Sequence, residues 1–316
     1  GAHSAATSNR PRPEAWAVTE AASLLKQAQK PLILAGRGVR WGGGAQQLVA
    51  LAEAMTIPVI TTEMGRGTMP EDHPLAGGLV GHFGHSAANG LLREADVVLG
   101  LGSRFLNVST INWSMIAPDT KIIQVETDPL EIGKQYAVEL GIHADSGVFL
   151  DDLCAEVGAT GSAEIDEAHP RVKHVAELIA DQHARYYDTD LDAVPIKPQR
   201  ITKAIEEICD RDAIFVFGSG LHTQFAHGIQ MRAPEQYNYS IGSGTMAWAL
   251  PGAVGAKLAF PDRQVVVCIG DGDFGMNAQE IETSVRENAP IVVIIYNDCS
   301  FGALRVFQKQ HYGGRF

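Results

Sequence analysis

Short apolar runs alternate along the chain with stretches in which apolar residues recur at helical spacing. Residues 14–30 (EAWAVTEAASLLKQAQK) and 44–55 (GAQQLVALAEAM) have the helical spacing, and the run PLILAGRG between them is typical of a buried strand that ends in glycines. IPVITT, ADVVLGLGSRF and TKIIQVETD are further strand-like runs. This alternation predicts a parallel sheet covered by helices.

The same alternation returns after a polar, turn-rich stretch at residues 155–195, where we expect a linker with one helix around His174. AIFVFGSG, QVVVCIG and IVVIIY are the strand-like runs of this second part, and TMAWALPGAVGAKLAF and ALRVFQKQ are its clearest helices. The predicted fold class is therefore α/β, with two doubly wound parallel-sheet domains. We expect them at residues 14–153 and 196–316, with 1–13 a linker or cloning remnant and 154–195 a linker.

Composition and charge exclude several classes of protein. The 316 residues include 25 Lys and Arg against 37 Asp and Glu, so the net charge is −12 and a nucleic-acid partner is not expected. The four cysteines (Cys154, Cys209, Cys268 and Cys299) form no CxxC pair, so neither a zinc site nor a disulfide framework is indicated. The first residues lack the apolar core of a signal peptide, and we expect a cytoplasmic protein.

Two polar side chains follow buried strands in the second domain. Asp271 comes directly after QVVVCIG, Asn297 comes directly after IVVIIY, and 24 residues separate Gly272 from Asn297. Since ligands of parallel sheets bind at the carboxyl ends of strands, the two side chains are expected to meet there. Carboxylate and amide oxygens suit Mg²⁺ that shares its shell with a phosphate. A helix beginning near Asn277 is expected to direct its N–H groups at the same anion.

The opposing interpretation is that Gly270-Asp271-Gly272 is only a turn. Asp-Gly is common in hairpins between alternating strands, but the following residues, DFGMNAQEIE, do not have a strand pattern. The combination of strand, GDG, a helical stretch, a second strand and Asn therefore favours a metal and diphosphate site.

This spacing resembles the motif of the thiamine diphosphate (ThDP) family that includes acetolactate synthase, pyruvate oxidase and benzoylformate decarboxylase. PLILAGRG, GRGTMPEDHPL, EADVVLGLGSRF and IIQVETDPLEIGK resemble the Rossmann-like central domain of these enzymes, and GSGTMAWALPGAVGAKLA and GDGDFGMNAQEIETSV resemble their diphosphate-binding domain. The ending SFGALRVFQKQHYGGRF is most similar to acetolactate synthase large subunits. The resemblance covers essentially the whole chain and implies a ThDP- and Mg²⁺-dependent enzyme that decarboxylates a 2-oxo acid and transfers the acyl group.

The resemblance also implies roles for individual residues. Asp271, Asn297 and the backbone carbonyl of Cys299 would bind Mg²⁺. The diphosphate would be held by the backbone of Gly272 and Asp273 and by the turn Gly220, Leu221 and His222. The Gly244 carbonyl would accept a hydrogen bond from the aminopyrimidine, and Met246 would bend the cofactor. From the residues alone, Met246 is better explained as an ordinary core methionine, and His222 is explained equally well as an exposed loop histidine.

Acetolactate synthases carry FAD on the central domain, whereas relatives hold ADP or nothing. The positions that match FAD contacts are Gly36, Gly38, Gly102, Arg104, Glu126 and Asp145. The stretch AGRGVRWGGG follows a strand as a dinucleotide loop does, but it is not GxGxxG, and LNVS follows GSRF where the synthases have charged residues. FAD, ADP and an empty domain all stay open.

The family's catalytic glutamate lies in a pyrimidine-binding domain that precedes the central domain. This chain begins where that domain should have ended and stops before the usual C-terminus, so we expect no catalytic residue in it. The isolated chain is expected to be inactive and to bind ThDP–Mg²⁺ weakly. The expected partners are a pyrimidine-binding domain, in cis or in trans, a small 2-oxo acid and further copies of the chain in a dimer or tetramer.

Three alternatives remain. The first is a ThDP-dependent decarboxylase, lyase or acyltransferase that acts on another substrate, such as an aryl 2-oxo acid or a sulfo-aldehyde. A truncated, non-catalytic module is a second alternative. A nicotinamide-dependent oxidoreductase would bind NAD(H) at Gly36 to Gly44, but that interpretation leaves the spacing of Asp271 and Asn297 unexplained.

Overall fold

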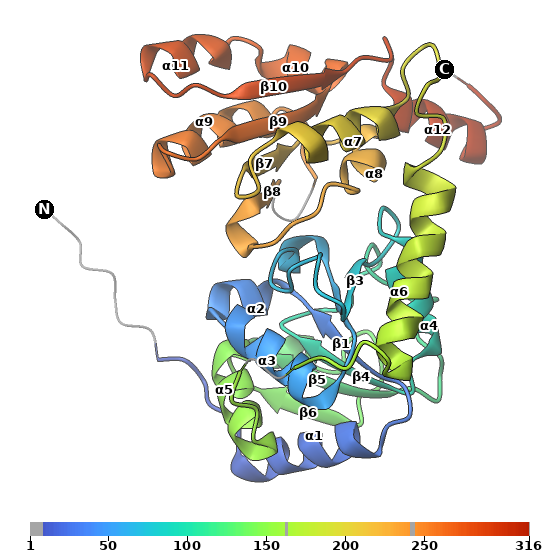
Figure 1. Cartoon of the computed structure of the whole chain (residues 1–316), viewed down its shortest axis with the longest axis vertical. Helices are drawn as coiled ribbons and strands as arrows, with labels where there is room; N and C mark the ends of the chain where they lie inside the picture. The colour runs from blue at the N-terminus through green and yellow to red at the C-terminus, as the bar shows by residue number, and fades with distance from the viewer. Residues whose placement is uncertain (1–8, 162–163, 241–243, 316) are drawn as a thin grey trace, which may run out of the picture. The chain divides into compact units, whose positions relative to one another are not determined.

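The computed structural model describes residues 9–161, 164–240 and 244–315 and shows an α/β chain in two compact units (Figure 1). Unit 1 contains the chain up to Met69 and His73–Ala176, and unit 2 contains Pro70–Asp72 and the chain from Glu177 onward. Within the described residues, no helix is both long enough and apolar enough to cross a membrane.

Unit 1 contains a six-stranded, all-parallel sheet, which confirms the predicted fold class. Its strands are β1 (Pro31–Ala35), β2 (Val59–Thr61), β3 (Ala76–Leu79), β4 (Val97–Leu101), β5 (Lys121–Glu126) and β6 (Leu140–His143). The strand order β3-β2-β1-β4-β5-β6 is that of dinucleotide-binding sheets, whose ligand crevice lies between the first and fourth strands.

Apolar helix faces form the core of unit 1 against this sheet. The helices are α1 (Ala15–Gln27), α2 (Arg37–Gly42), α3 (Ala45–Met55), α4 (Ser86–Glu94) and α5 (Ser146–Val157), with short 3₁₀ turns η1 (Glu63–Gly65) and η2 (Pro129–Glu131). Residues of α1, α3 and α5 share one buried cluster with alternate residues of the central strands, including Ile33, Leu99 and Ile123. α5 continues to Val157, past the domain end expected at residue 153.

The predicted helix around His174 is α6 (Pro170–Gln182), and it is followed by a single π-helical turn, η3 (His183–Tyr187). These elements carry the chain from unit 1 into unit 2.

Unit 2 contains a four-stranded parallel sheet in the order β10-β9-β7-β8. Its strands are β7 (Ile214–Phe217), β8 (Tyr237–Tyr239), β9 (Val265–Gly270) and β10 (Val292–Tyr296). Its helices are α7 (Pro198–Ile208), α8 (His222–Ala226), α9 (Ala249–Ala259), α10 (Asp271–Asn277), α11 (Glu280–Arg286) and α12 (Gly302–His311), with one 3₁₀ turn, η4 (Pro234–Gln236). Alternate residues of β7 and β9 pack against α9, so the sheet positions the loops at its carboxyl end.

Candidate functional site

The strands β9 and β10 bring the two predicted metal ligands to the same edge of the sheet. They pair in parallel, and the register sets Gly270 opposite Tyr296. Asp271 and Asn297 are the residues that directly follow these two strands, so they lie at neighbouring strand ends. Adjacent strands lie about 4.8 Å apart. This register confirms the prediction that Asp271 and Asn297 follow neighbouring strands at the same end of the sheet.

The donor atoms at this edge suit a hard cation. The Asp271 carboxylate makes no hydrogen bond or ion pair with the described residues. Asn297 is exposed, and its Oδ1 accepts the Cys299 N–H at 3.1 Å in a local turn, with the Cys299 thiol at 3.4 Å. An amide oxygen has two lone pairs, so a cation at this oxygen would replace the weak thiol contact. One carboxylate, one amide and a backbone carbonyl fit Mg²⁺. No cluster of three or more His, Cys, Asp or Glu that could hold a metal occurs in the ranges that the structure covers.

The predicted diphosphate turn leads into the short helix α8, which begins at His222. His222 is 8 % exposed, so the interpretation of an exposed loop histidine is wrong. Its ring stacks on Tyr296 of β10, with ring centroids 5.3 Å apart. A Cβ on Gly220 would lie 2.9 Å from His222 Nδ1, so the ring is packed directly against this turn. The turn and the end of β10 are thereby fixed to each other.

Burial keeps the His222 imidazole uncharged. Burial lowers its pKa to about 4, against the opposing effects of the Cys268 carbonyl and the Asp298 and Asp271 carboxylates. A neutral ring brings a hydrogen-bonding group, and no positive charge, to the predicted diphosphate. The charge that balances a diphosphate must therefore come from the metal or from N–H groups.

The GDG stretch forms the start of a helix. α10 begins at Asp271 and ends at Asn277, so the prediction of a helix beginning near Asn277 was wrong. Two carboxylates in its first turn, Asp271 and Asp273, favour a helix at this point because they lie near the positive end of its dipole. A Cβ on Gly272 would lie 2.7 Å from the exposed Phe301 ring, so a larger residue at that position would have to displace this ring.

The Asp273 side chain has a role that the sequence prediction did not assign. Only its backbone was expected to contribute, yet its carboxylate is 1 % exposed and accepts the Ser219 N–H at 2.7 Å and the Ala247 N–H at 2.5 Å. Burial raises the pKa of Asp273, and the two N–H groups oppose that effect. No local pattern signals these bonds, because Ser219 and Ala247 lie 54 and 26 residues away in the chain.

The predicted aminopyrimidine segment lies next to the diphosphate turn. The Gly244 carbonyl already accepts the Ser219 hydroxyl at 2.6 Å, which leaves it one further lone pair for a ligand. Met246 is half-buried and does not belong to the buried cluster that β7 and β9 form with α9. This partial burial does not support the interpretation of Met246 as a core methionine. The role of Met246 in bending the cofactor stays a prediction.

In unit 1 the glycines predicted for FAD are packed against one another. A Cβ on Gly38 would lie 2.6 Å from Gly102 Cα, and Gly102 has a positive φ of 56°. The Gly36 and Gly38 N–H groups donate to the Leu101 and Gly102 carbonyls, at 2.8 and 3.2 Å. The stretch after β1, expected to resemble a dinucleotide loop, is instead the helix α2. Close packing of α2 against the end of β4 thus accounts for these glycines without a ligand.

The predicted FAD side chains have local partners as well. The Asp145 carboxylate caps α5 by accepting the Gly147 and Val148 N–H groups at 2.9 and 3.2 Å. Glu126 is buried and accepts the Thr127 N–H at 2.9 Å, and Arg104 is half-buried at the end of β4. The FAD role of all six positions remains a prediction.

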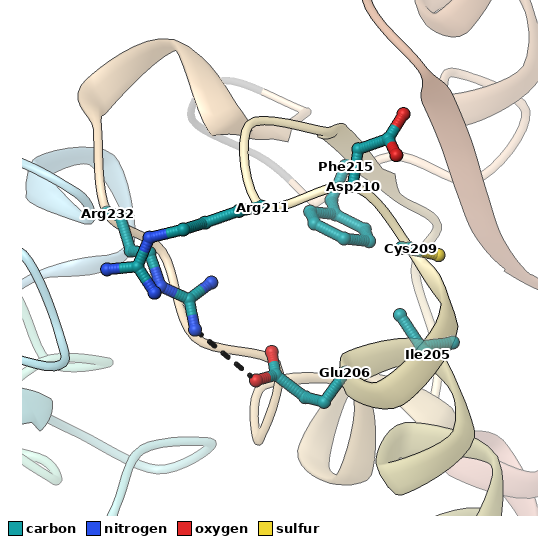
Figure 2. A pocket seen from close by; sticks show the side chains of 7 residues that line it. All are labelled: Ile205, Glu206, Cys209, Asp210, Arg211, Phe215 and Arg232. Carbon is teal, nitrogen blue, oxygen red and sulfur yellow. Dashed lines mark ion pairs between the residues drawn. The ribbon is translucent and has the colours of Figure 1, made fainter.

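A pocket of about 140 Å³ in unit 2 lies away from these strand ends, between the end of α7 and the start of β7 (Figure 2). It is lined by Ile205, Glu206, Cys209, Asp210, Arg211, Phe215 and Arg232. Arg232 is paired with Glu206 at 3.6 Å, dashed in Figure 2, and Arg211 and Arg232 both donate to Asp72. These arginines are neutralised by carboxylates, and none of the predicted cofactor residues lines this pocket.

The chain matches two family models. Residues 18–153 match the thiamine pyrophosphate enzyme central domain, and residues 218–316 match the thiamine pyrophosphate enzyme C-terminal TPP binding domain. The glycine contacts of unit 1 fall in the first match and the Asp271–Asn297 edge falls in the second.

Relatives with similar sequences are acetolactate synthases. The chain is 36% identical over 305 residues to a protein named "Probable acetolactate synthase large subunit" from Methanocaldococcus jannaschii, a match of 94% of this chain and 51% of that protein. It is 35% identical to the acetolactate synthase large subunit of Corynebacterium glutamicum (96% and 48%) and 33% identical to the acetolactate synthase of Mycobacterium bovis (96% and 49%). The chain spans about half the length of these relatives. The chain belongs to the thiamine pyrophosphate enzyme family, and it contains two of the domains of these enzymes, the central domain and the C-terminal TPP-binding domain.

Proposed function

We propose that this chain is the central and diphosphate-binding part of an enzyme that uses ThDP and Mg²⁺ to decarboxylate a 2-oxo acid and to transfer the resulting acyl carbanion equivalent, as acetolactate synthases do. The observation that supports this most directly is the register of β9 and β10, which sets Asp271 and Asn297 on neighbouring strand ends. The unpaired Asp271 carboxylate and the exposed Asn297 amide are suited to one divalent cation.

The residues present fit the cofactor. Asp271, Asn297 and the Cys299 carbonyl would hold Mg²⁺, and the first N–H groups of α10 with the turn at Gly220 would hold the diphosphate. Because His222 is neutral and buried, it would fix this turn and add no charge. The Gly244 carbonyl and Met246 would contact the aminopyrimidine. When bound, ThDP supplies the carbon nucleophile and accepts the electrons released with CO₂.

We assign no catalytic side chain to this chain. The family's catalytic glutamate belongs to a pyrimidine-binding domain, which would be supplied in cis or in trans, and the active form would be a dimer or tetramer. We accordingly propose that the purified chain alone is inactive and binds ThDP–Mg²⁺ weakly. Turnover of pyruvate by this chain alone would contradict that proposal.

The central domain is proposed as a nucleotide-binding domain with FAD, ADP or no ligand. Its strand order supports a nucleotide crevice between β1 and β4. A crevice without a ligand is supported equally well, because Gly38 and Asp145 already make hydrogen bonds with other residues of the chain. Absorbance of the purified protein at flavin wavelengths, followed by titration with FAD and ADP, distinguishes the three cases.

Two other functions fit parts of the same observations. A decarboxylase, lyase or acyltransferase with another 2-oxo acid or a sulfo-aldehyde would use the same cofactor residues. A non-catalytic module would keep the fold and give no turnover even when a pyrimidine-binding domain is supplied. A nicotinamide-dependent oxidoreductase is no longer a supported alternative, because both matched domains belong to the thiamine pyrophosphate enzyme family.

The deciding experiment is titration calorimetry of the chain with ThDP in MgCl₂ and, as a control, in EDTA. We expect binding only with the metal. Addition of a family pyrimidine-binding domain should then restore ThDP-dependent CO₂ release from a 2-oxo acid. Binding that is absent in both buffers would refute the cofactor assignment, and binding without restored release would favour the non-catalytic module.

A further inference from the structure

A buried carboxylate connects two loops that lie far apart in the sequence of unit 2. Asp273 Oδ2 accepts the Ser219 N–H at 2.7 Å, from the turn after β7. Asp273 Oδ1 accepts the Ala247 N–H at 2.5 Å, from the segment before α9. Because the carboxylate is 1 % exposed, water does not compete for either bond.

A second residue of α10, Asn277, also binds the segment that contains Ala247. The Asn277 side-chain amide donates to the Ala247 carbonyl at 2.6 Å. Asp273 and Asn277 are four residues apart and therefore lie on one face of the helix. Together they bind both the N–H and the carbonyl of Ala247, which has a positive φ of 69°. A non-glycine residue keeps this conformation only where its surroundings enforce it.

The two loops also contact each other directly. The Ser219 hydroxyl donates to the Gly244 carbonyl at 2.6 Å. A Cβ on Gly218 would lie 2.9 Å from the Ile269 side chain and would also overlap Asp273 Oδ2, so no side chain fits between the turn and the carboxylate. The three segments around residues 218–219, 244–247 and 273–277 thus form one hydrogen-bonded unit at the carboxyl ends of β7 and β9.

We propose that Asp273 is a positioning residue: its carboxylate, with Asn277, holds the Gly244–Ala247 segment at a fixed distance from the Ser219 turn. This inference rests on the proposed function, in which that segment contacts the aminopyrimidine and the turn at Gly220 contacts the diphosphate. The spacing of the two cofactor subsites is then set by the protein before the cofactor arrives. A carboxylate is required because two N–H donors need two acceptor oxygens, and an amide offers only one.

The first test measures amide hydrogen exchange in the cofactor-free chain. In Asp273→Ala, exchange at Ser219 and Ala247 should accelerate at least about tenfold, and in Asp273→Asn one of the two should. Asn277→Ala should accelerate exchange around Ala247 and leave Ser219 unchanged. The matched control is Asp262→Asn, an exposed carboxylate of the same unit, which should change neither amide. Protected amides of β9 report that each variant is folded. Unchanged exchange at Ser219 and Ala247 in both Asp273 variants would overturn the proposal.

The second test compares two ligands in the presence of Mg²⁺. Inorganic pyrophosphate reaches only the diphosphate subsite, whereas ThDP must span both subsites. In Asp273→Asn we expect the affinity for ThDP to fall at least about tenfold and the affinity for pyrophosphate to change less than about threefold. Equal losses for both ligands would indicate general damage and would contradict a positioning role. If the unaltered chain binds neither ligand, the proposed function fails, and the exchange result alone still decides whether Asp273 fixes the two loops.

Discussion

The two units present glycines and carboxylates at the carboxyl ends of parallel strands, but these groups are engaged in different ways. In unit 1, Gly38 donates its N–H to Gly102 and packs against it, and Asp145 caps α5. In unit 2, the Asp271 carboxylate has no hydrogen-bond partner in the parts of the chain that are described, and Asn297 is exposed beside it. The glycines are thus poor indicators of a ligand, whereas the unpaired carboxylate at a strand end is the feature on which the proposed metal site rests.

The difference follows from how each feature affects the stability of its unit. A glycine at a strand-to-helix turn lets two backbones approach closely, which stabilises the unit with or without a nucleotide. The Asp271 carboxylate, in contrast, interacts favourably with the dipole of α10 but has no hydrogen-bond or ion-pair partner among the described residues, and we propose that a bound cation neutralises it. The glycines of unit 1 are therefore explained by packing, whereas the polar side chains at the strand ends of unit 2 are those for which we propose a ligand.

The largest expected effect tests the packing glycines of unit 1. Gly102→Ala should lower the free energy of unfolding by about 4 kcal/mol, because the Cβ would overlap Gly38 and the residue has a positive φ. Gly43→Ala is the matched control: its φ is 70° and nothing lies within 4 Å of its Cβ, so only about 1 kcal/mol of backbone strain is expected. Urea unfolding followed by tryptophan fluorescence reports mainly on unit 1, which holds Trp16, Trp41 and Trp113. Equal losses in the two variants would show that Gly102 is not a packing glycine.

A second effect concerns the buried histidine of unit 2. The unfolded imidazole takes up a proton near pH 6.5, whereas native His222 does so only near pH 4. The unfolded state therefore binds more protons between these values, and stability should fall as pH drops from 6.5 to 4, by at most roughly 3 kcal/mol. His222→Phe should flatten this part of the curve, and His82→Gln, an exposed histidine, should leave it unchanged. Denaturant unfolding at several pH values, without Mg²⁺, is the measurement. A curve that His222→Phe does not alter would refute the neutral, buried state.

A third effect separates the carboxylates of the two units. Asp271→Asn should weaken Mg²⁺-dependent binding of ThDP on the order of 100-fold, or about 2.7 kcal/mol, since Asp271 is the one charged group among the three proposed metal ligands. Glu126→Gln, a buried carboxylate at the strand edge of unit 1, should change that affinity less than about twofold. Calorimetric titrations of both variants make the comparison. If Asp271→Asn bound as tightly as the unaltered chain, the metal would lie elsewhere.

Elements with strong apolar patterns could be predicted, because continuous apolar runs favour strands. The expected burial was wrong for β10, since Val292 is 48 % and Ile295 is 40 % exposed. The runs that became β1, β4, β9 and β10 fixed the parallel sheets and placed Asp271 and Asn297 at one edge. The short strands β3 (AGGL), β6 (LGIH) and β8 (YNY) could not be predicted, since glycine and polar residues mask the pattern and pairing with neighbours makes them strands.

The structure around the candidate site was predicted less completely than its ligands. The start of α10 was misplaced because the three glycines of GDGDFG disfavour a helix, whereas the two carboxylates at the helix N-terminus stabilise one there. The contacts of Asp273 and the stacking of His222 on Tyr296 join residues far apart in the chain. Such contacts depend on the assembled sheet, so no local pattern contains them.

The smallest expected effect tests whether Asp145 has a structural or a ligand-binding role. Its carboxylate accepts two N–H groups at the start of α5, as an N-cap does. Asp145→Ala should therefore cost about 1 kcal/mol of unfolding free energy, whereas Asp145→Asn, which keeps one capping oxygen, should cost only a few tenths. The measurement is the urea midpoint with and without added FAD. If FAD stabilises the unaltered chain and both variants lose that stabilisation, Asp145 contacts the nucleotide and unit 1 is a binding unit like unit 2. If FAD has no effect and only the alanine variant is destabilised, the residue is explained by its cap, and the contrast between packing in unit 1 and binding in unit 2 holds.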